Sequence, residues 1–340
     1  MRTGSRVAIF GNESYTFIET EASGENKMSC ITDRKHQSVY TESEFAPLKR
    51  VILSQSEQAP SQKSDSGMGI LSILMERERA NLKTLLEYYG AEVIMPRRLT
   101  GYEKEAASSP DGPTNGGGMT NFYSRDPFAV IGDNIIELNL RSRERRYEVL
   151  TARDILAAES VKNNCRYVSM PRIDISQGTD GGPGPFLEGG DILLLGKTVY
   201  VGQSDWGSNE NGFQWLKSYL STFGYQCRAV RIQGNIAHLD CVISLVRDGL
   251  MIVCEDCLPD GLPEEFASWD KILVPSEAAD RLAVNGLSIN EEVYVTDTAF
   301  RETVGKELEK RGIHVEYLDF RITRTFKGSF RCSTNPLLRG

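Results

Sequence analysis

Four widely separated polar clusters contain the side chains that covalent chemistry on a planar cation requires. They lie at residues 123–126 (YSRD), 188–191 (EGGD), 238–240 (HLD) and 328–334 (GSFRCST). An ionised cysteine is the best nucleophile among side chains at neutral pH, and a nearby imidazolium or cationic substrate favours the thiolate. A buried thiol and an unrelated histidine would be the simpler interpretation of an arbitrary pair. The polar neighbours favour chemistry, with Cys332 as nucleophile and His238 as its acid–base partner.

Four acids accompany this pair: Asp126, Glu188, Asp191 and Asp240. A carboxylate accepts two hydrogen bonds in the plane in which a guanidinium group donates them. Each acid alone is better explained as a helix cap, a turn former or a solvated charge. Together they carry more negative charge than a structural core tolerates without a positive partner. The set therefore predicts a site that receives a guanidinium-like cation.

A recurring unit of strand, tight turn, strand and helix must position these clusters. The predicted units comprise strands 128–131 and 135–138 with helix 149–162; strands 192–195 and 199–201 with helix 209–223; strands 242–246 and 251–253 with a weaker helix 263–268; strand 292–295, helix 300–311 and strand 315–318; and an opening unit of strand 48–53, helix 69–89 and strand 92–95. Five such units predict pseudo-repeats of one module around an axis, whereas hairpins and helices alone leave an irregular α+β domain open. The acids and His238 lie at the starts of successive units, so rotational stacking would bring them to one central channel.

Composition excludes several classes of function. The 340-residue chain has 40% apolar residues, enough for a substantial core, and a formal charge of −8 with a pI near 5.2. This charge argues against a nucleic-acid binder or a protein of anionic membrane surfaces. Seven scattered cysteines favour a reducing, cytoplasmic setting, and we expect a soluble protein because no apolar run approaches a membrane span. Residues 1–42 are a polar leader without assigned chemistry, and residues 43–340 are predicted to form a single catalytic domain.

Other motifs carry less information. Cys254 and Cys257 have redox or zinc spacing, but no second pair completes a tetrahedral site, so structural thiols beside a turn are favoured. The glycine-rich stretches at 108–120 and 178–185 lack the lysine of a phosphate loop and are interpreted as loops that line or cover the site. No metal or cofactor is expected.

With these residues in view, the chain resembles the guanidine-modifying, or pentein, superfamily. Its members include arginine deiminases, dimethylarginine dimethylaminohydrolases and amidinotransferases. The resemblance spans about residues 43–339 and implies a five-bladed α/β-propeller of ββαβ units around a central active-site channel. Residues 124–132 (SRDPFAVIG) and 187–191 (LEGGD) resemble the deiminase branch, whereas residues 135–143, 209–216 and 318–332 are more similar to amidinotransferases.

The resemblance implies a role for each cluster. Cys332 would attack the guanidinium carbon, His238 would protonate the leaving amine, and Glu188 would orient or charge-balance His238. Asp126 and Asp240 would grip the guanidinium nitrogens, with Asp191 supporting them.

Two arginines also enter this comparison. Arg145 matches a family arginine that binds a substrate carboxylate, but Arg143 and Arg146 are competing matches, and a solvated helix face or surface ion pairs are the structural alternative. Arg331 departs from the family, where histidine usually precedes the nucleophile, and would stabilise the thiolate or shape the pocket.

The leading hypothesis is a deiminase-type hydrolase that acts on arginine or an arginine-like metabolite through a covalent amidino-thioether. One alternative is an amidinotransferase, in which an amine acceptor intercepts the same intermediate. Another is a non-catalytic protein that binds guanidino ligands. Small molecules are the expected partners, rather than nucleic acid or membrane, and a homo-oligomer is left open.

Overall fold

The computed structural model describes residues 4–10, 13–19, 29–31, 38–55, 67–107, 122–174, 176 and 181–340. The chain divides into two compact units, Met1–Ser38 and Val39–Gly340. In the smaller unit, β1 (Gly4–Phe10), β2 (Glu13–Glu19) and β3 (Ser29–Ile31) form an antiparallel sheet. The sequence pattern placed the boundary after residue 42 and assigned the leader no chemistry. The structure assigns residues 39–42 to the larger unit and forms strands in the smaller one.

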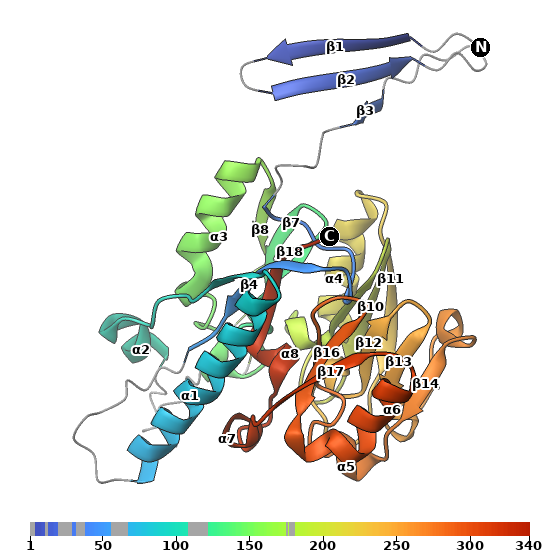
Figure 1. The fold of residues 1–340 in the computed structure, drawn as a ribbon. Helices are drawn as coiled ribbons and strands as arrows, with labels where there is room; N and C mark the ends of the chain where they lie inside the picture. Colours follow the sequence, from blue (N-terminus) through green and yellow to red (C-terminus); the bar gives the residue numbers. More distant parts are fainter. Residues whose placement is uncertain are drawn as a thin grey trace. The chain divides into compact units, whose positions relative to one another are not determined.

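Five three-stranded sheets build the larger unit (Figure 1). In each sheet the central strand is antiparallel to one neighbour and parallel to the other. The sheets are β18 (Thr334–Arg339), β4 (Leu48–Leu53) and β5 (Glu92–Ile94); β6 (Phe128–Ile131), β7 (Asn134–Glu137) and β8 (Arg166–Ser169); β9 (Ile192–Leu195), β10 (Thr198–Gln203) and β11 (Gln226–Arg231); β12 (Ile243–Arg247), β13 (Leu250–Val253) and β14 (Asp270–Leu273); and β15 (Leu287–Ser288), β16 (Val293–Asp297) and β17 (His314–Leu318). The predicted five-bladed α/β-propeller is confirmed.

The connection inside each blade follows from strand direction. An antiparallel pair needs only a tight turn, whereas the parallel third strand requires a crossover, which is helical in most blades. The crossovers contain α1 (Gly67–Tyr88), α3 (Leu150–Asn163), α4 (Glu210–Ser221) and α6 (Lys306–Lys310), and the fourth blade has short 3-10 helices at Glu255–Cys257 and Glu264–Phe266. The helix expected at 263–268 is thus a single 3-10 turn, and the one expected at 300–311 begins with a 3-10 turn and a π-helical turn before α6.

Turn chemistry explains why these hairpins form where they do. Gly132 has a φ of +55° between β6 and β7, and a Cβ there would lie 2.2 Å from the Tyr225 hydroxyl oxygen. Only glycine fits both constraints. At the start of α4 the Asn209 side chain accepts a hydrogen bond from the Gly212 amide at 3.0 Å and caps the helix.

One blade joins the two ends of the larger unit. β18, near the C-terminus, pairs antiparallel with β4, which in turn runs parallel to β5. The Asn335 side-chain amide donates to the carbonyls of Ser124, Arg125 and Phe128 at 2.9, 3.2 and 2.7 Å, so the closing strand is also tied to the start of the second blade. The sequence pattern did not predict β18.

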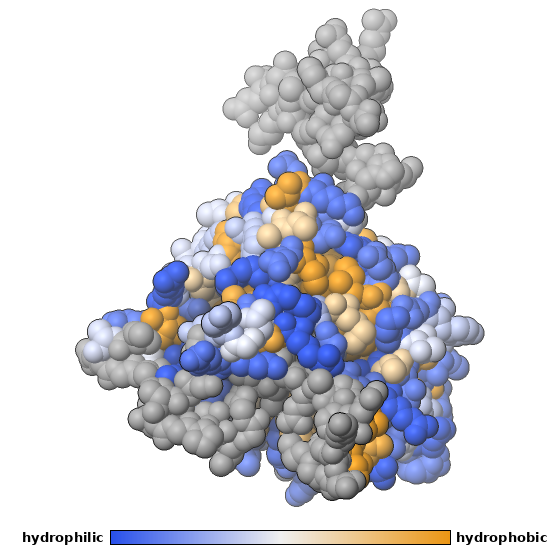
Figure 2. All heavy atoms as spheres, turned by 90° about the vertical axis from the view of Figure 1, so that its left-hand side faces the viewer, coloured by the Kyte–Doolittle hydropathy of each residue, from blue (hydrophilic) through white to orange (hydrophobic). Residues whose placement is uncertain are grey.

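Apolar side chains of the strands and crossovers fill the blades and the spaces between them. On the face shown in Figure 2, hydrophilic residues are interspersed with apolar ones over the described surface. Within the described part of the chain, no helix combines the length and apolar character that crossing a bilayer demands. Shorter elements complete the unit: α2 (Gly101–Ala107), α5 (Ser276–Asp280), α7 (Arg321–Arg324) and α8 (Phe330–Ser333).

The contacts of Asn335 generate a stability prediction. Asn335→Ala leaves three buried carbonyls without this donor, so we expect the free energy of unfolding to fall by about 1–3 kcal/mol. Urea denaturation measures this loss, with Lys49→Ala, an exposed substitution on β4, as control. A change within about 0.5 kcal/mol of the control would show that Asn335 does not hold the closure together.

Candidate active site

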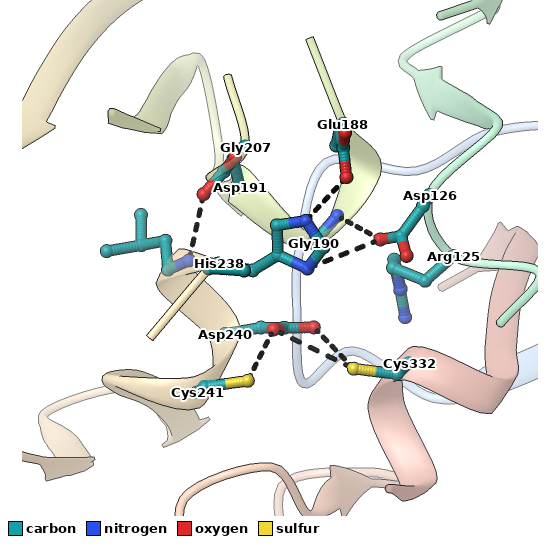
Figure 3. A network of polar contacts seen from close by, with 12 residues as sticks. Arg125, Asp126, Glu188, Gly190, Asp191, Gly207, His238, Asp240, Cys241 and Cys332 are labelled. Carbon is teal, nitrogen blue, oxygen red and sulfur yellow. Dashed lines mark hydrogen bonds and ion pairs between the residues drawn. The ribbon is translucent and has the colours of Figure 1, made fainter. Parts of the chain in front are cut away.

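The candidate residues occupy the same place in successive blades. Asp126 lies just before β6, Asp191 just before β9, Asp240 just before β12 and Cys332, in α8, just before β18. Two of these segments are 3-10 turns, at Gly189–Asp191 and Leu239–Cys241. Because the blades repeat one geometry, equivalent positions converge, and the clusters predicted from the sequence come together (Figure 3).

Two glycines allow the convergence at the 188–191 segment. A Cβ on Gly189 would lie 1.9 Å from the Arg125 carbonyl oxygen, and a Cβ on Gly190 would lie 2.7 Å from His238 Nδ1. The Gly190 amide instead donates to Asp126 Oδ1 at 3.0 Å. The paired glycines therefore let the backbone approach both the imidazole and the neighbouring carboxylate.

His238 is held between two carboxylates. Its Nε2 lies 2.6 Å from Glu188 Oε2, and its Nδ1 lies 3.7 Å from Asp126 Oδ1. The remaining Glu188 oxygen accepts the Arg141 amide at 2.7 Å, which fixes the carboxylate toward the ring. All three side chains are buried.

The carboxylates set the charge state of this histidine. Burial acts against protonation, but the charges of Asp126 and Glu188 and the Glu188 hydrogen bond outweigh it and raise the pKa of His238 well above its usual range. Burial likewise opposes ionisation of Asp126, yet His238 and Arg145 hold its pKa below the usual value. The result is an imidazolium at neutral pH, the form that can donate a proton.

Cys332 faces a third carboxylate. Its Sγ lies 3.6 and 3.9 Å from the two oxygens of Asp240, and only 3% of the residue is exposed. Asn285 fixes this approach, because its Oδ1 accepts the Cys332 amide at 3.3 Å while its Nδ2 donates to the Asp240 carbonyl at 3.2 Å. Asn285 lies just before β15, the fifth equivalent position of the propeller.

Arg331 is buried and held between two carboxylates, those of Asp240 and Glu44. Its Nη1 donates to Asp240 Oδ2 at 2.9 Å, and its Nε and Nη2 donate to Glu44 at 3.0 and 3.1 Å. Burial disfavours the charged guanidinium, but Glu44 and Asp240 reverse this effect and raise its pKa. Arg331 therefore balances the charge of Asp240 through Oδ2, the oxygen that also lies 3.6 Å from Cys332 Sγ.

Arg145 is engaged by acids of its own chain. Its Nη2 donates to Asp126 Oδ2 and Glu148 Oε2, each at 2.9 Å, and its Nη1 lies 3.9 Å from Glu188 Oε2. About 19% of its side chain is exposed, so it is more accessible than the acids around it. The structure places Arg145 beside the site, whereas Arg146 bonds the carbonyl of Leu140.

Asp191 accepts hydrogen bonds from two different loops at the site, which contain Ser208 and Leu239. Its Oδ1 accepts the Leu239 amide at 2.9 Å, and its Oδ2 accepts the Ser208 amide at 3.0 Å. Burial raises its pKa to about 7 despite the nearby His238. These contacts position the segment that carries His238 and Asp240.

A second thiol, that of Cys241, lies beside Cys332. Cys241 Sγ is 3.4 Å from Asp240 Oδ1, and the contact with Cys332, burial and the Asp240 charge together raise the pKa of Cys241 well above its usual value. Ligand atoms of Asp240, Cys241 and Cys332 lie within 4.8 Å of one another, as do those of Asp126, Glu188 and His238. The first set has donor types that zinc accepts, whereas the second is already joined by its own ion pairs.

The structure thus brings together the eight residues singled out from the sequence. Other participants were not singled out: Glu44, Arg125, Glu148, Cys241 and Asn285. Arg125 lies within the predicted 123–126 cluster but was given no role, and nothing local marks Glu44, Glu148 or Cys241. Only Asn285 had a usable signal, its place before the fifth hairpin. The loop at 108–120 and residues 178–180 lie outside the described residues. Cys254 and Cys257 are buried away from these clusters, with sulfurs 3.2 Å apart beside a 3-10 turn.

Comparison with known proteins connects this geometry to characterised enzymes. The family model described as N,N dimethylarginine dimethylhydrolase, eukaryotic, matches residues 120–339, more than half of the chain. Inosamine-phosphate amidinotransferase 1 of Streptomyces glaucescens is 28% identical over 258 residues, which cover 68% of this chain and 71% of that protein. The relatives therefore include guanidine-modifying enzymes of both the hydrolase and the amidinotransferase type.

Solved structures agree on the fold. Inosamine-phosphate amidinotransferase StrB1 from Streptomyces griseus superposes with a TM-score of 0.73 at 23% identity, covering 88% of this chain and 97% of that one. A dimethylarginine dimethylaminohydrolase variant from Pseudomonas aeruginosa, complexed with citrulline, gives a TM-score of 0.63 at 14% identity, with coverages of 85% and 99%. The predicted superfamily is confirmed.

The ion pair of His238 yields a pH prediction. Because the folded-state pKa is raised, protonation of His238 stabilises the fold below an unfolded pKa of about 6.5, and this contribution is lost as the pH rises through the folded value. Glu188→Gln removes one negative charge, so we expect the pKa of His238 to fall. NMR titration of the imidazole nitrogens measures the shift, with the resonances of exposed His314, which contacts Glu316, as internal reference. Identical titration curves of His238 in the wild-type protein and in Glu188→Gln would contradict the conclusion that Glu188 raises the pKa of His238.

Proposed function

Because this chain belongs to the dimethylarginine dimethylhydrolase family matched above, we propose that it is a hydrolase of guanidino groups with Cys332 as the nucleophile. The observation that carries the proposal is the pairing of a buried thiol against Asp240 with an imidazolium held by Glu188 in the same convergence of loops. The substrate class is arginine or an arginine bearing methyl groups on the guanidino nitrogens.

In the first step, the thiolate of Cys332 adds to the guanidinium carbon. The C–N bond to the leaving nitrogen then breaks as the imidazolium of His238 gives that nitrogen a proton, and ammonia or a methylated amine departs. The enzyme now holds an amidino-thioether, and His238 is neutral. Proton donation from His238 is supported by its raised pKa.

In the second step, water replaces the sulfur. Neutral His238 takes one proton from water as the oxygen adds to the amidino carbon, and the C–S bond then breaks. The second proton of that water leaves the new hydroxyl group as the urea carbonyl forms, and it converts the departed ammonia or amine to its ammonium form, so that a neutral citrulline-type urea group is released. Cys332 returns as thiolate and His238 as imidazolium. The balance is one guanidinium and one water in, and one urea group and one ammonium or alkylammonium out.

Asp240 and Asp126, the two carboxylates proposed to bind the substrate, differ in how many further hydrogen bonds they can accept. Asp240 Oδ2 is taken by Arg331, but Oδ1 contacts only the two thiols. Asp126 already accepts the Gly190 amide and Arg145, one on each oxygen. We therefore assign Asp240 Oδ1 the main role in receiving a guanidinium N–H next to Cys332, and Asp126 the role of charging His238 and holding Arg145.

The substrate's amino-acid end is assigned to Arg145. Its Nη1 is the least engaged of its nitrogens, because the nearest carboxylate oxygen is 3.9 Å away, and its side chain is partly exposed. A substrate carboxylate there would meet a guanidinium fixed in place by Asp126 and Glu148.

Amidino transfer is the second candidate function. The observation in its favour is the 28% identity to an inosamine-phosphate amidinotransferase. The first step would be unchanged, and an amine would replace water in the second. A guanidino-binding protein without turnover is the remaining alternative and would bind ligand equally well after loss of Cys332.

A product assay tests the nucleophile. Purified protein is incubated with arginine and with methylated arginines in ¹⁸O-labelled water, and products are identified by mass spectrometry. We expect ¹⁸O-labelled citrulline, and a loss of at least about 10³-fold in rate for Cys332→Ala. Cys165→Ala, a thiol outside the site, is the matched control. Full activity of Cys332→Ala would end the proposal.

The same incubations, repeated with a panel of primary amines, distinguish the reactions. Ornithine and a new guanidino compound that form only when an amine is added would establish transfer and refute hydrolysis. Saturable binding without any product in the wild-type protein would establish the binding-protein alternative.

A further inference from the structure

We propose that the larger unit binds one small monovalent anion, of about the size of chloride, in a cavity behind the nucleophile, between Arg125 and Arg339. The cavity has a volume of about 20 Å³, and its polar lining comes from Thr41, Ser43, Glu44, Arg125, Asn335 and Arg339. A space of roughly 10–15 Å³ suffices for one water molecule, so this cavity accepts a single particle of that order. Neither Cys332 nor His238 lines it.

Two buried guanidinium donors at this cavity have no hydrogen-bond acceptor among the described residues. Arg125 Nη2 and Arg339 Nε are both buried without a hydrogen-bond partner, although Arg125 is only 7% and Arg339 only 4% exposed. Other nitrogens hold these side chains in place. Arg125 Nε donates to the Arg331 carbonyl at 3.3 Å, and Arg339 Nη1 and Nη2 donate to the carbonyls of Ala46 and Ser288 at 2.7 and 2.8 Å. A buried cationic donor without an acceptor is costly.

The hydroxyl group of Ser43 adds a third donor. Ser43 Oγ accepts the amides of Phe45 and Ala46 at 3.1 and 2.9 Å, which leaves its hydrogen available to donate. Asn335 contributes nothing further, because its amide already serves three carbonyls.

The charges around the cavity do not balance. Arg125, Arg331 and Arg339 are three buried cations, whereas Glu44 and Asp240 are the two buried anions that act on them, which leaves one positive charge in excess. Glu44 has little left to offer, since its oxygens accept Arg331 and the Leu194 amide.

Deprotonation of an arginine is a poor solution to this imbalance. Burial and the like charge of Arg331 lower the pKa of Arg125 to about 9 and that of Arg339 to about 10, which is still well above neutral pH. Guanidinium groups also stay charged in proteins as a rule. A bound anion would remove the excess charge and provide an acceptor for both free donors.

The anion would support the nucleophile indirectly. The Arg125 amide donates to the Cys332 carbonyl at 3.1 Å, so the residue that lines the cavity also holds the backbone of α8. A thiolate at Cys332 would not replace the anion, because Cys332 lies outside the cavity and cannot reach its free donors.

The direct test uses crystals of the full chain soaked in bromide. We expect an anomalous peak between Arg125 and Arg339, in the wild-type protein and equally in Cys332→Ala. In solution, thermal unfolding is compared in chloride and in gluconate, a monovalent anion too large for the cavity, at equal ionic strength. We expect chloride to raise the Tm by about 2 °C or more.

Two substitutions test whether the chloride-dependent shift in Tm arises at this cavity. Arg339→Gln removes the excess charge and one free donor, and Ser43→Asp supplies a tethered carboxylate that can still accept the amides of Phe45 and Ala46. Each should abolish the chloride-dependent shift in Tm. Arg153→Gln, which removes an exposed partner of Glu137 on α3, is the matched control and should retain the shift. If Arg339→Gln fails to fold, the Tm values of Ser43→Asp and the bromide peak decide whether the anion binds in the cavity.

Three outcomes would overturn the inference. The first is equal Tm values in the two salts with water alone in the cavity. The second is a bromide peak without any shift in Tm, which would mean an adventitious ion only. The third is a chloride-dependent shift that persists in both substituted proteins, because it would arise elsewhere on the molecule.

Discussion

The antiparallel pairing of β18 with β4 is the constraint on which the rest of the structure depends. It joins the last strand of the larger unit to its first and thereby closes five similar blades into a ring. Cys332 lies in the short helix that leads into this strand, so the bond network that closes the ring also positions the proposed nucleophile. Asn335 extends the closure to the neighbouring blade. Folding and assembly of the site are therefore one event.

Closure of the ring assembles the site because equivalent positions of the blades converge on its centre. Asp126, Asp191, Asp240, Asn285 and Cys332 each lie just before the hairpin of a different blade. Such convergence buries acids that would repel one another, so each needs compensation from a cation or from backbone donors. The protein meets this need with arginines of its own and with an imidazolium, and the same network that stabilises the acids sets their chemical roles.

The five modules could be predicted from the sequence because hairpins and crossovers are local, marked by turn glycines and by changes in hydrophobic period. β18 could not be predicted in the same way, since its partner lies at the other end of the unit. The site residues were identifiable because their motifs place unusual polar groups before strands. The contacts of Arg331 could not be predicted from the sequence, because they depend on Glu44, a partner 287 residues away in the chain. Long-range ion pairs leave no periodic signal.

The internal arginines show how the site can distinguish a substrate from its own side chains. Arg331 and Arg145 each occupy one oxygen of a carboxylate, on Asp240 and Asp126 respectively. Both oxygens of Asp240 lie near Cys332 Sγ, but among the described residues only Oδ1 has no cationic partner, so in the proposed mechanism it is the oxygen that can receive a second guanidinium. Neutralisation by Arg331 also limits how strongly Asp240 repels a nearby thiolate. The buried ion pair between Arg331 and Asp240 thus allows the carboxylate that we propose binds the substrate to lie beside the sulfur that we propose attacks it.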